Sequence, residues 1–185
     1  KTMEARSVPG LFFIGEVNNK ENPDYLPPFP VHEENRIPEK EQSLVLDFTA
    51  LQPGHVARIR KQVSPQGDDY TRYDELTWYL YNPSHETADL DIFTRVGSDT
   101  LNYYEIDLRY GDTDRRTGWW RVGVDIAELA NAKNDSVGAD GVIRTVVHDV
   151  SSGVPYPVRV VGLPDLRRVR RYYFGVANNT RWEVS

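Results

Sequence analysis

Residues 90–108 read LDIFTRVGSDTLNYYEIDL, and this stretch gives the clearest indication of the fold. Mostly apolar residues alternate with mostly polar ones over residues 90–96, and the alternation returns over residues 103–108. In a β-strand every second side chain lies on the same face, so each run predicts a strand with one buried face. Residues 97–99, Gly-Ser-Asp, separate the two runs with residue types that favour a turn.

The same period of two recurs along the chain and predicts further strands. These runs cover residues 44–48, 57–63, 76–81, 119–126, 158–161 and 169–176. Residues 125–133 are the one segment rich in helix formers, and residues 134–141 contain the glycine and aspartate of a loop. No crossover helices separate the strands. We therefore predict an all-β fold, namely a jelly-roll-like antiparallel β-sandwich with one short helix.

The first 41 residues differ from the rest of the chain. Six of the twelve prolines lie there, and proline removes a backbone donor and favours extended chain before it. We predict an extended Pro-rich arm over residues 1–41 and a β-sandwich domain over residues 42–185. Residues 11–14 would pair as a strand, and the remainder would lie on the domain surface with Tyr25, Leu26 and Phe29 as anchors.

Composition narrows the classes of function. The formal net charge is −6, which disfavours binding to phosphate backbones and so to nucleic acid. The absence of cysteine excludes a disulfide framework, a thiolate zinc site and a cysteine nucleophile. The sequence contains no run of 18 consecutive apolar residues, so it predicts no direct membrane span. The four histidines are scattered without metal-ligand spacing, and no hydrolase or nucleotide-binding motif is present.

Aromatic residues are the first candidate for a contact with a ligand or partner. One sheet face would present rings that stack on a sugar or anchor a protein partner. The candidate residues are Tyr79, Tyr81, Tyr103, Trp119 and Tyr172, with Tyr173 as a further member. The alternative is that many of these rings pack in the core or under the Pro-rich arm.

Aspartates in two loops form the second candidate, a calcium site, and the prediction is otherwise that no cofactor binds. Asp112, Asp114, Asp135 and Asp140 supply hard oxygen ligands, although neither loop matches the EF-hand pattern, and ordinary turn aspartates are the competing interpretation. Paired carboxylates such as Glu105 and Asp107 would serve a glycosidase if the distance between them were suitable. A solvated outer face balanced by Arg95, Arg109 and Arg121 is the preferred interpretation of those carboxylates.

Several stretches together resemble the SprA-type proteins, also called Sov, which form the outer-membrane translocon of type IX secretion. The most specific match is FTRVGSD at residues 93–99 followed by NYYEIDL at residues 102–108; the family has F-x-R-x-G-S-D and N-Y-Y-E-Y-E. Residues 38–46, 70–76 and 158–178 match in the same order, so the resemblance covers about residues 38–185. The chain departs from the family at Leu163 and Ala177, where the family has asparagine and arginine.

The resemblance implies a non-catalytic structural or interaction domain of a large bacterial cell-surface or outer-membrane protein. Its partners would be other domains or subunits of a cell-envelope assembly, on the extracellular or periplasmic side. The alternative is a jelly-roll carbohydrate-binding module that holds a glycan on its aromatic sheet face. In the family, the glycine–serine–aspartate segment would be structural: a glycine turn followed by a strand with one aromatic side chain on each face.

Overall fold

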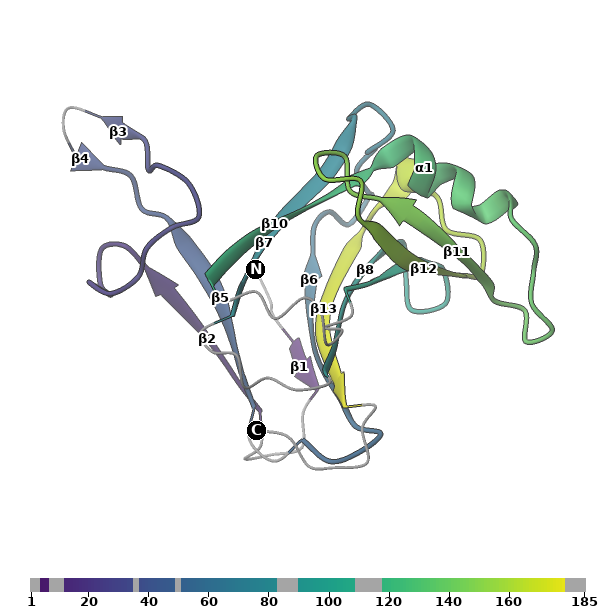
Figure 1. Ribbon diagram of the computed structural model, residues 1–185, viewed down its shortest axis with the longest axis horizontal. Coiled ribbons are helices and arrows are strands. Elements are labelled where there is room, and N and C mark those ends of the chain that lie inside the picture. Colours follow the sequence, from purple (N-terminus) through teal and green to yellow (C-terminus); the bar gives the residue numbers. More distant parts are fainter. Residues whose placement is uncertain are drawn as a thin grey trace.

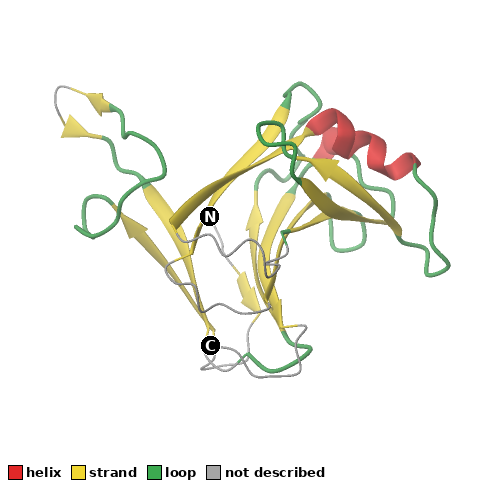
Figure 2. Cartoon of the chain, in the orientation of Figure 1, coloured by secondary structure: helices red, strands yellow, loops and turns green. Residues whose placement is uncertain are grey.

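The computed structural model describes residues 4–6, 12–34, 37–48, 51–82, 90–108 and 118–178 (Figure 1). These residues form an all-β antiparallel sandwich with one short α-helix, as Figure 2 shows, and this confirms the predicted fold class. The strands are β1 (Glu4–Arg6), β2 (Phe12–Asn18), β3 (Glu33–Glu34), β4 (Ile37–Pro38), β5 (Gln42–Phe48), β6 (Val56–Gln62), β7 (Glu75–Asn82), β8 (Leu90–Gly97), β9 (Tyr103–Asp107), β10 (Gly118–Asp125), β11 (Ile143–His148), β12 (Pro155–Val161) and β13 (Arg171–Asn178). The helix α1 (Ile126–Asn131) and the 3₁₀ turns η1 (Ala132–Asn134) and η2 (Leu166–Arg168) complete the described elements.

The larger layer is a seven-stranded sheet in the order β1-β6-β13-β8-β9-β12-β11. Every neighbouring pair in it is antiparallel. The strand β13 lies between β6 and β8, so the last described strand of the chain is central to the sheet. The pairing of β8 with β9 places Val96 opposite Tyr104 and Arg95 opposite Glu105, which fixes which side chains share a face.

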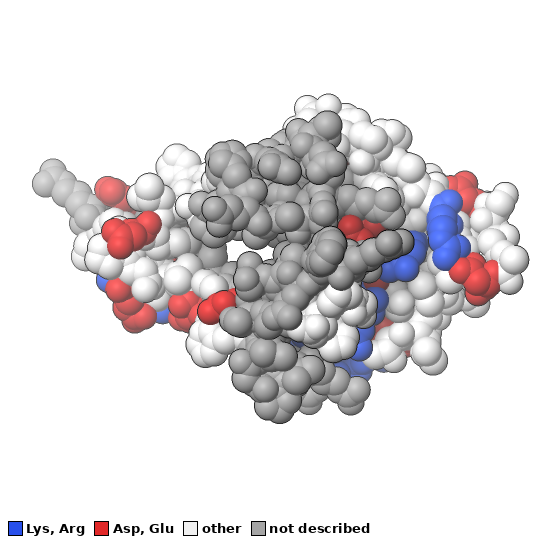
Figure 3. All heavy atoms as spheres, turned by 60° about the horizontal axis from the view of Figure 1, so that its bottom comes forward, with Lys and Arg blue, Asp and Glu red and all other residues white. Residues whose placement is uncertain are grey.

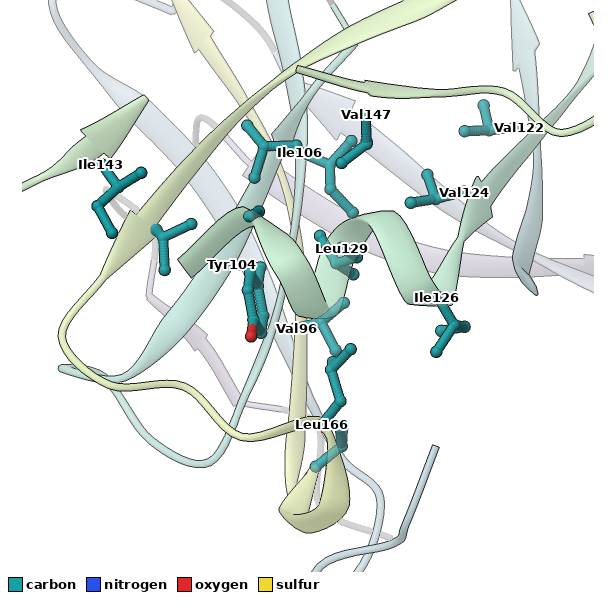
Figure 4. Close-up of a cluster of buried hydrophobic side chains, with 14 of the residues drawn as sticks. Val96, Tyr104, Ile106, Val122, Val124, Ile126, Leu129, Ile143, Val147 and Leu166 are labelled. Atoms are coloured by element: carbon teal, nitrogen blue, oxygen red, sulfur yellow. The ribbon is translucent and has the colours of Figure 1, made fainter. Parts of the chain in front are cut away.

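The smaller layer is the β7–β10 pair, which packs with α1 over one face of the large sheet. Val122 and Val124 of β10 are fully buried, and so is Leu129 of the helix. The helix begins where Asp125 caps it, because the Asp125 carboxylate accepts hydrogen bonds from the backbone N–H groups of Ala127 and Glu128 at 2.7 and 2.9 Å. Figure 4 shows the resulting cluster, in which Leu129 lies among side chains from both layers.

Most predicted strands are confirmed, but the strand β11 was not predicted. Its sequence, IRTVVH, places two valines side by side, so the period of two is unclear. The structure buries only Ile143 and Val147 and leaves Val146 46% exposed. This strand forms the last position of the seven-stranded sheet and pairs only with β12 among the described strands. A weak pattern is typical of such an edge strand.

The Pro-rich arm contains a strand that forms a separate two-stranded sheet with β5. The prediction of a strand at residues 11–14 is confirmed in β2, which runs farther than predicted and pairs along its whole length with β5. Residues 19–41 are therefore a long connection between two paired strands, with the two-residue strands β3 and β4 near its middle. No described helix is long and apolar enough to cross a membrane.

Candidate interaction surface on the outer face of β7–β10

The outer face of β7–β10 carries aromatic side chains side by side. The pairing places Trp119 opposite Tyr81 and Arg121 opposite Tyr79, while Trp120 and Leu80 point to the core side. The Tyr81 and Trp119 ring centroids lie 5.0 Å apart. Strand alternation thus gives this two-stranded sheet one apolar inner face and one aromatic outer face.

The Pro-rich connection lies against this outer face. The Trp119 indole Nε1–H donates a 2.7 Å hydrogen bond to the backbone carbonyl of Leu26. The Tyr25 ring meets Trp119 edge to face with centroids 6.3 Å apart, and the Phe29 ring meets Tyr79 in the same manner at 5.5 Å. These edge-on arrangements are the favourable ones for aromatic pairs. The rings therefore hold a proline-containing segment of the same chain, which bends at Pro28 and Phe29.

The contact leaves much apolar surface in solvent. The side chain of Leu26 is 74% exposed, Tyr81 is 55% exposed and Phe29 is 39% exposed. A second hydrogen bond, 2.7 Å between the hydroxyl groups of Tyr25 and Ser43, holds the segment to β5. A few contacts with half-exposed groups contribute little free energy compared with a fully buried cluster.

An ion pair lies at the other end of the outer face of β7–β10. Arg121 Nη2 lies 2.5 Å from Glu75 Oε1, and this hydrogen bond raises the pKa of Arg121. The other guanidinium nitrogen, Nη1, donates to Ser151 Oγ at 3.3 Å. The remaining carboxylate oxygen, Glu75 Oε2, is buried and has no hydrogen-bond partner among the described residues. Arg121 therefore connects β7 to the turn after β11.

The prediction of one aromatic sheet face is wrong, because the five candidate residues lie on three surfaces. Tyr79, Tyr81 and Trp119 share the outer face of β7–β10. Tyr103 lies on the outer face of the seven-stranded sheet, with the Arg95 guanidinium 4.7 Å from its ring centroid. Tyr172 lies on the opposite face of that sheet, since it pairs with Val96, which in turn pairs with the buried Tyr104. Sequence alternation gives the face of each strand but not which strands are neighbours.

Glu105 lies on the same face of β9 as Tyr103, and its predicted pairing with Arg95 is confirmed, but the predicted solvation of its carboxylate is wrong. Glu105 is only 2% exposed, and its two oxygens each accept from an arginine, Arg95 on β8 and Arg159 on β12. Arg121 pairs with Glu75 instead, and Arg109 lies outside the described residues. Two charged partners on flanking strands make Glu105 the centre of a cross-strand ion triad.

The calcium residues fall in two groups. Asp112 and Asp114 lie outside the described residues. Asp140 accepts from both guanidinium Nη atoms of Arg144 at 3.0 and 2.6 Å and from the Val142 backbone N–H, and these hydrogen bonds lower the pKa of Asp140 to about 2. Asp135 follows the η1 turn. Within the described ranges no three His, Asp or Glu side chains gather closely enough to hold a metal ion, so the calcium site remains a prediction.

A tyrosine-lined pocket of about 380 Å³ was not predicted. Its walls include Tyr70, Tyr73 and Tyr172, together with the carboxylates of Asp68, Asp69 and Glu75. Tyr70 and Tyr73 meet edge to face with centroids 6.1 Å apart, and Tyr70 lies 6.1 Å from Tyr172. Burial and a hydrogen bond with Tyr70 raise the pKa of the Tyr172 phenol. The run DDYTRYDE at residues 68–75 was a sequence signal for this pocket. Tyr172 could not be assigned to the pocket from sequence, because the β-bridge between Asp68 and Val169 brings the two segments together.

The residues that carry the resemblance to SprA-type proteins build a turn. Asp99 Oδ1 accepts hydrogen bonds from the backbone N–H groups of Leu101 and Asn102 at 2.8 and 2.9 Å. Asn102 Oδ1 in turn accepts from the backbone N–H of Leu163 at 2.8 Å. A Cβ atom at Gly97 would lie 2.2 Å from the Asn102 carbonyl oxygen, so this position requires glycine. The segment thus joins β8 to β9 and fastens that turn to the chain after β12.

Charge is unevenly distributed around the arm. Figure 3 shows mostly acidic side chains on the left part of one face, which is the side of β2–β5 in Figure 1, and basic side chains next to acidic ones farther to the right. The exposed Glu16, Glu33 and Glu39 belong to β2 and to the connection that follows it. The surface around the arm is therefore mainly acidic.

No protein-family model matches the chain, and no curated protein matches it. The class of protein is therefore defined by its own geometry. It is an antiparallel β-sandwich in which one aromatic sheet face binds a proline-rich segment.

Proposed function

We propose that this chain is a non-catalytic interaction domain of a large bacterial cell-surface or outer-membrane protein of the SprA type. The observation that carries the proposal is the hydrogen bond from Trp119 Nε1 to the Leu26 carbonyl, flanked by the ring contacts of Tyr25 and Phe29. An aromatic surface with one indole donor recognises a polypeptide backbone while making few demands on its side chains. Such a surface suits docking between domains of an assembly.

The likeness to SprA-type proteins supports the second half of the proposal. Gly97, Asp99 and Asn102, which match the most specific family motif, each have a definite structural task in the β8–β9 turn. Residues that stabilise a turn in this way are expected in a domain whose role is structural. The proposal therefore assigns the domain a role in building or capping an envelope assembly, with other subunits or cargo as partners.

An immunoblot of fractionated native cells with an antibody against this domain tests the assignment. We expect a band far larger than the 21.2 kDa of this chain, in the outer-membrane fraction. A band near the mass of the chain itself, in the medium or the periplasm, would contradict a domain of a SprA-like protein.

The tyrosine pocket favours a second candidate function, glycan binding. Three tyrosine rings line about 380 Å³ together with Asp68 and Asp69, so the pocket combines apolar stacking surfaces with acceptors for sugar hydroxyl groups, while Glu75 is paired with Arg121. This site differs from the sheet face predicted for glycans, because the arm lies on Tyr79 and Trp119. A glycan array distinguishes the two candidate functions. Glycan binding that is abolished by Tyr73→Ala would support a carbohydrate-binding module. The absence of glycan binding would favour the interaction domain.

A further inference from the structure

We propose that the outer face of β7–β10 is a docking surface for a proline-containing segment of a partner protein, and that residues 25–29 of this chain are its resident competitor. This inference rests on the proposed function and adds the chemistry of the partner. The occupant is defined by the segment already present, which reads YLPPF.

The first step concerns the backbone that the outer face of β7–β10 recognises. Leu26 precedes Pro27-Pro28, and a residue before proline is restricted to extended geometry. A polyproline-type chain makes no internal hydrogen bonds and therefore presents free carbonyl oxygens. Trp119 supplies the matching donor, and its hydrogen bond of 2.7 Å ends on the carbonyl directly before the first proline. A stiff segment also loses little conformational entropy when it binds.

The second step concerns spacing. Tyr25 contacts Trp119 on β10, whereas Phe29 contacts Tyr79 on β7. Four residues of straight polyproline-type chain would span about 12 Å, at roughly 3.1 Å per residue, and the bend at Pro28 and Phe29 shortens this span. Tyr79 lies two positions along β7 from Tyr81, the residue opposite Trp119, and two positions correspond to about 7 Å along a strand. The reach of the rings covers the difference, so the two anchor rings bracket the Leu-Pro-Pro core of the motif.

The third step concerns why a partner can replace the resident segment. Leu26 is 74% exposed and Phe29 is 39% exposed, so the segment is held by few buried groups. Both of its ends are tethered by the paired strands β2 and β5. Tethering gives the resident segment a high effective concentration, of the order of millimolar for a short flexible link. A partner therefore binds measurably only when its own affinity is higher or when the resident contacts are weakened.

A labelled peptide of residues 22–30, NPDYLPPFP, tests the proposal by fluorescence anisotropy with the complete chain. We expect weak binding to the wild type and at least about tenfold tighter binding to a Tyr25→Ala/Phe29→Ala variant, because the resident segment then competes less. Adding Trp119→Phe keeps a ring but removes the Nε1–H donor. That change should weaken binding by about three- to tenfold, the worth of one neutral hydrogen bond.

Two controls keep the test specific. Tyr103→Phe alters an aromatic residue on the other sheet and should leave the affinity unchanged, and a peptide with both central prolines replaced by alanine should bind less well. Circular dichroism establishes that each variant is folded. The proposal is overturned if the arm variant binds the peptide no better than the wild type, or if Trp119→Phe leaves its affinity unchanged. Neither result affects the immunoblot, which tests the assignment to the cell envelope independently.

Discussion

The two faces of the β7–β10 pair differ strongly in how deeply their contacts are buried. On the inner face, Val122 and Val124 are fully buried against the seven-stranded sheet and the helix. On the outer face, Tyr81 stays 55% exposed although the arm lies beside it. Removal of apolar surface from water contributes roughly 25 cal/mol per Å², so the inner face dominates stability. One two-stranded sheet therefore supports both a permanent contact and an exchangeable one.

The largest expected effect lies on the permanent side of this comparison. Leu129→Ala removes a fully buried side chain from the centre of the core cluster. Such a change leaves a cavity as well as losing transfer free energy, so we expect the free energy of unfolding to fall by about 3 kcal/mol. Urea titration followed by tryptophan fluorescence measures this loss.

A matched leucine outside the core serves as the control for that measurement. Leu163 is 87% exposed, so Leu163→Ala should change the free energy of unfolding by less than about 0.5 kcal/mol. Equal losses in the two variants would show that the cluster in Figure 4 does not dominate stability.

The next effect concerns Asp149, a buried carboxylate that fastens β10 to the turn after β11. It accepts hydrogen bonds from the backbone N–H groups of Gly123 at 2.7 Å, Ser151 at 3.0 Å and Ser152 at 2.9 Å. Burial alone would raise the pKa of Asp149, but the hydrogen bonds from Ser151, Gly123 and Ser152 outweigh burial and hold it well below its usual range. We expect Asp149→Asn to lower the free energy of unfolding by about 2 kcal/mol at pH 7.

The pH dependence of that loss has a definite sign. Because folding depresses the pKa, the Asp149 contribution is complete above the pKa of the unfolded chain, near 3.8, and disappears as the pH falls toward the lower folded value. The stability difference between wild type and Asp149→Asn should therefore shrink between about pH 5 and pH 2. A difference that stays constant over this range would contradict the assignment. The comparison of two variants cancels the other carboxylates with lowered pKa, such as Asp99 and Asp165.

The sequence predicted elements well and their assembly poorly, for a physical reason. The period of two over residues 90–108 depends only on local geometry, and β8 and β9 form there. The burial of Glu105, in contrast, depends on Arg159, which is brought beside it by pairing between distant strands. The tyrosine pocket likewise requires the bridge between Asp68 and Val169. Long-range register is not encoded in any single run of residues.

The aromatic candidates illustrate the same limit. Local alternation correctly puts Tyr103 and Tyr104 on opposite faces of β9, since Tyr104 is buried and Tyr103 is half-buried beside Arg95. It cannot show that Tyr172 shares the face of Tyr104, because that follows from the β13–β8–β9 order. The contact between arm and sheet was predicted, because Tyr25, Leu26 and Phe29 were expected to anchor the arm and each contacts Trp119 or Tyr79, although Leu26 does so through its backbone carbonyl while its side chain stays exposed.

The smallest expected effect on stability lies on the exchangeable side. Phe29→Ala removes one edge-on ring contact with Tyr79 from a side chain that is already 39% exposed, so the free energy of unfolding should fall by less than about 1 kcal/mol. Hydrogen exchange should nonetheless accelerate in residues 22–30, because local opening of the segment costs less than global unfolding. Exchange in β10 should stay unchanged. If exchange in β10 rose together with that of residues 22–30, the two faces of the β7–β10 pair would be one cooperative unit, and the arm would be part of the core instead of an exchangeable occupant.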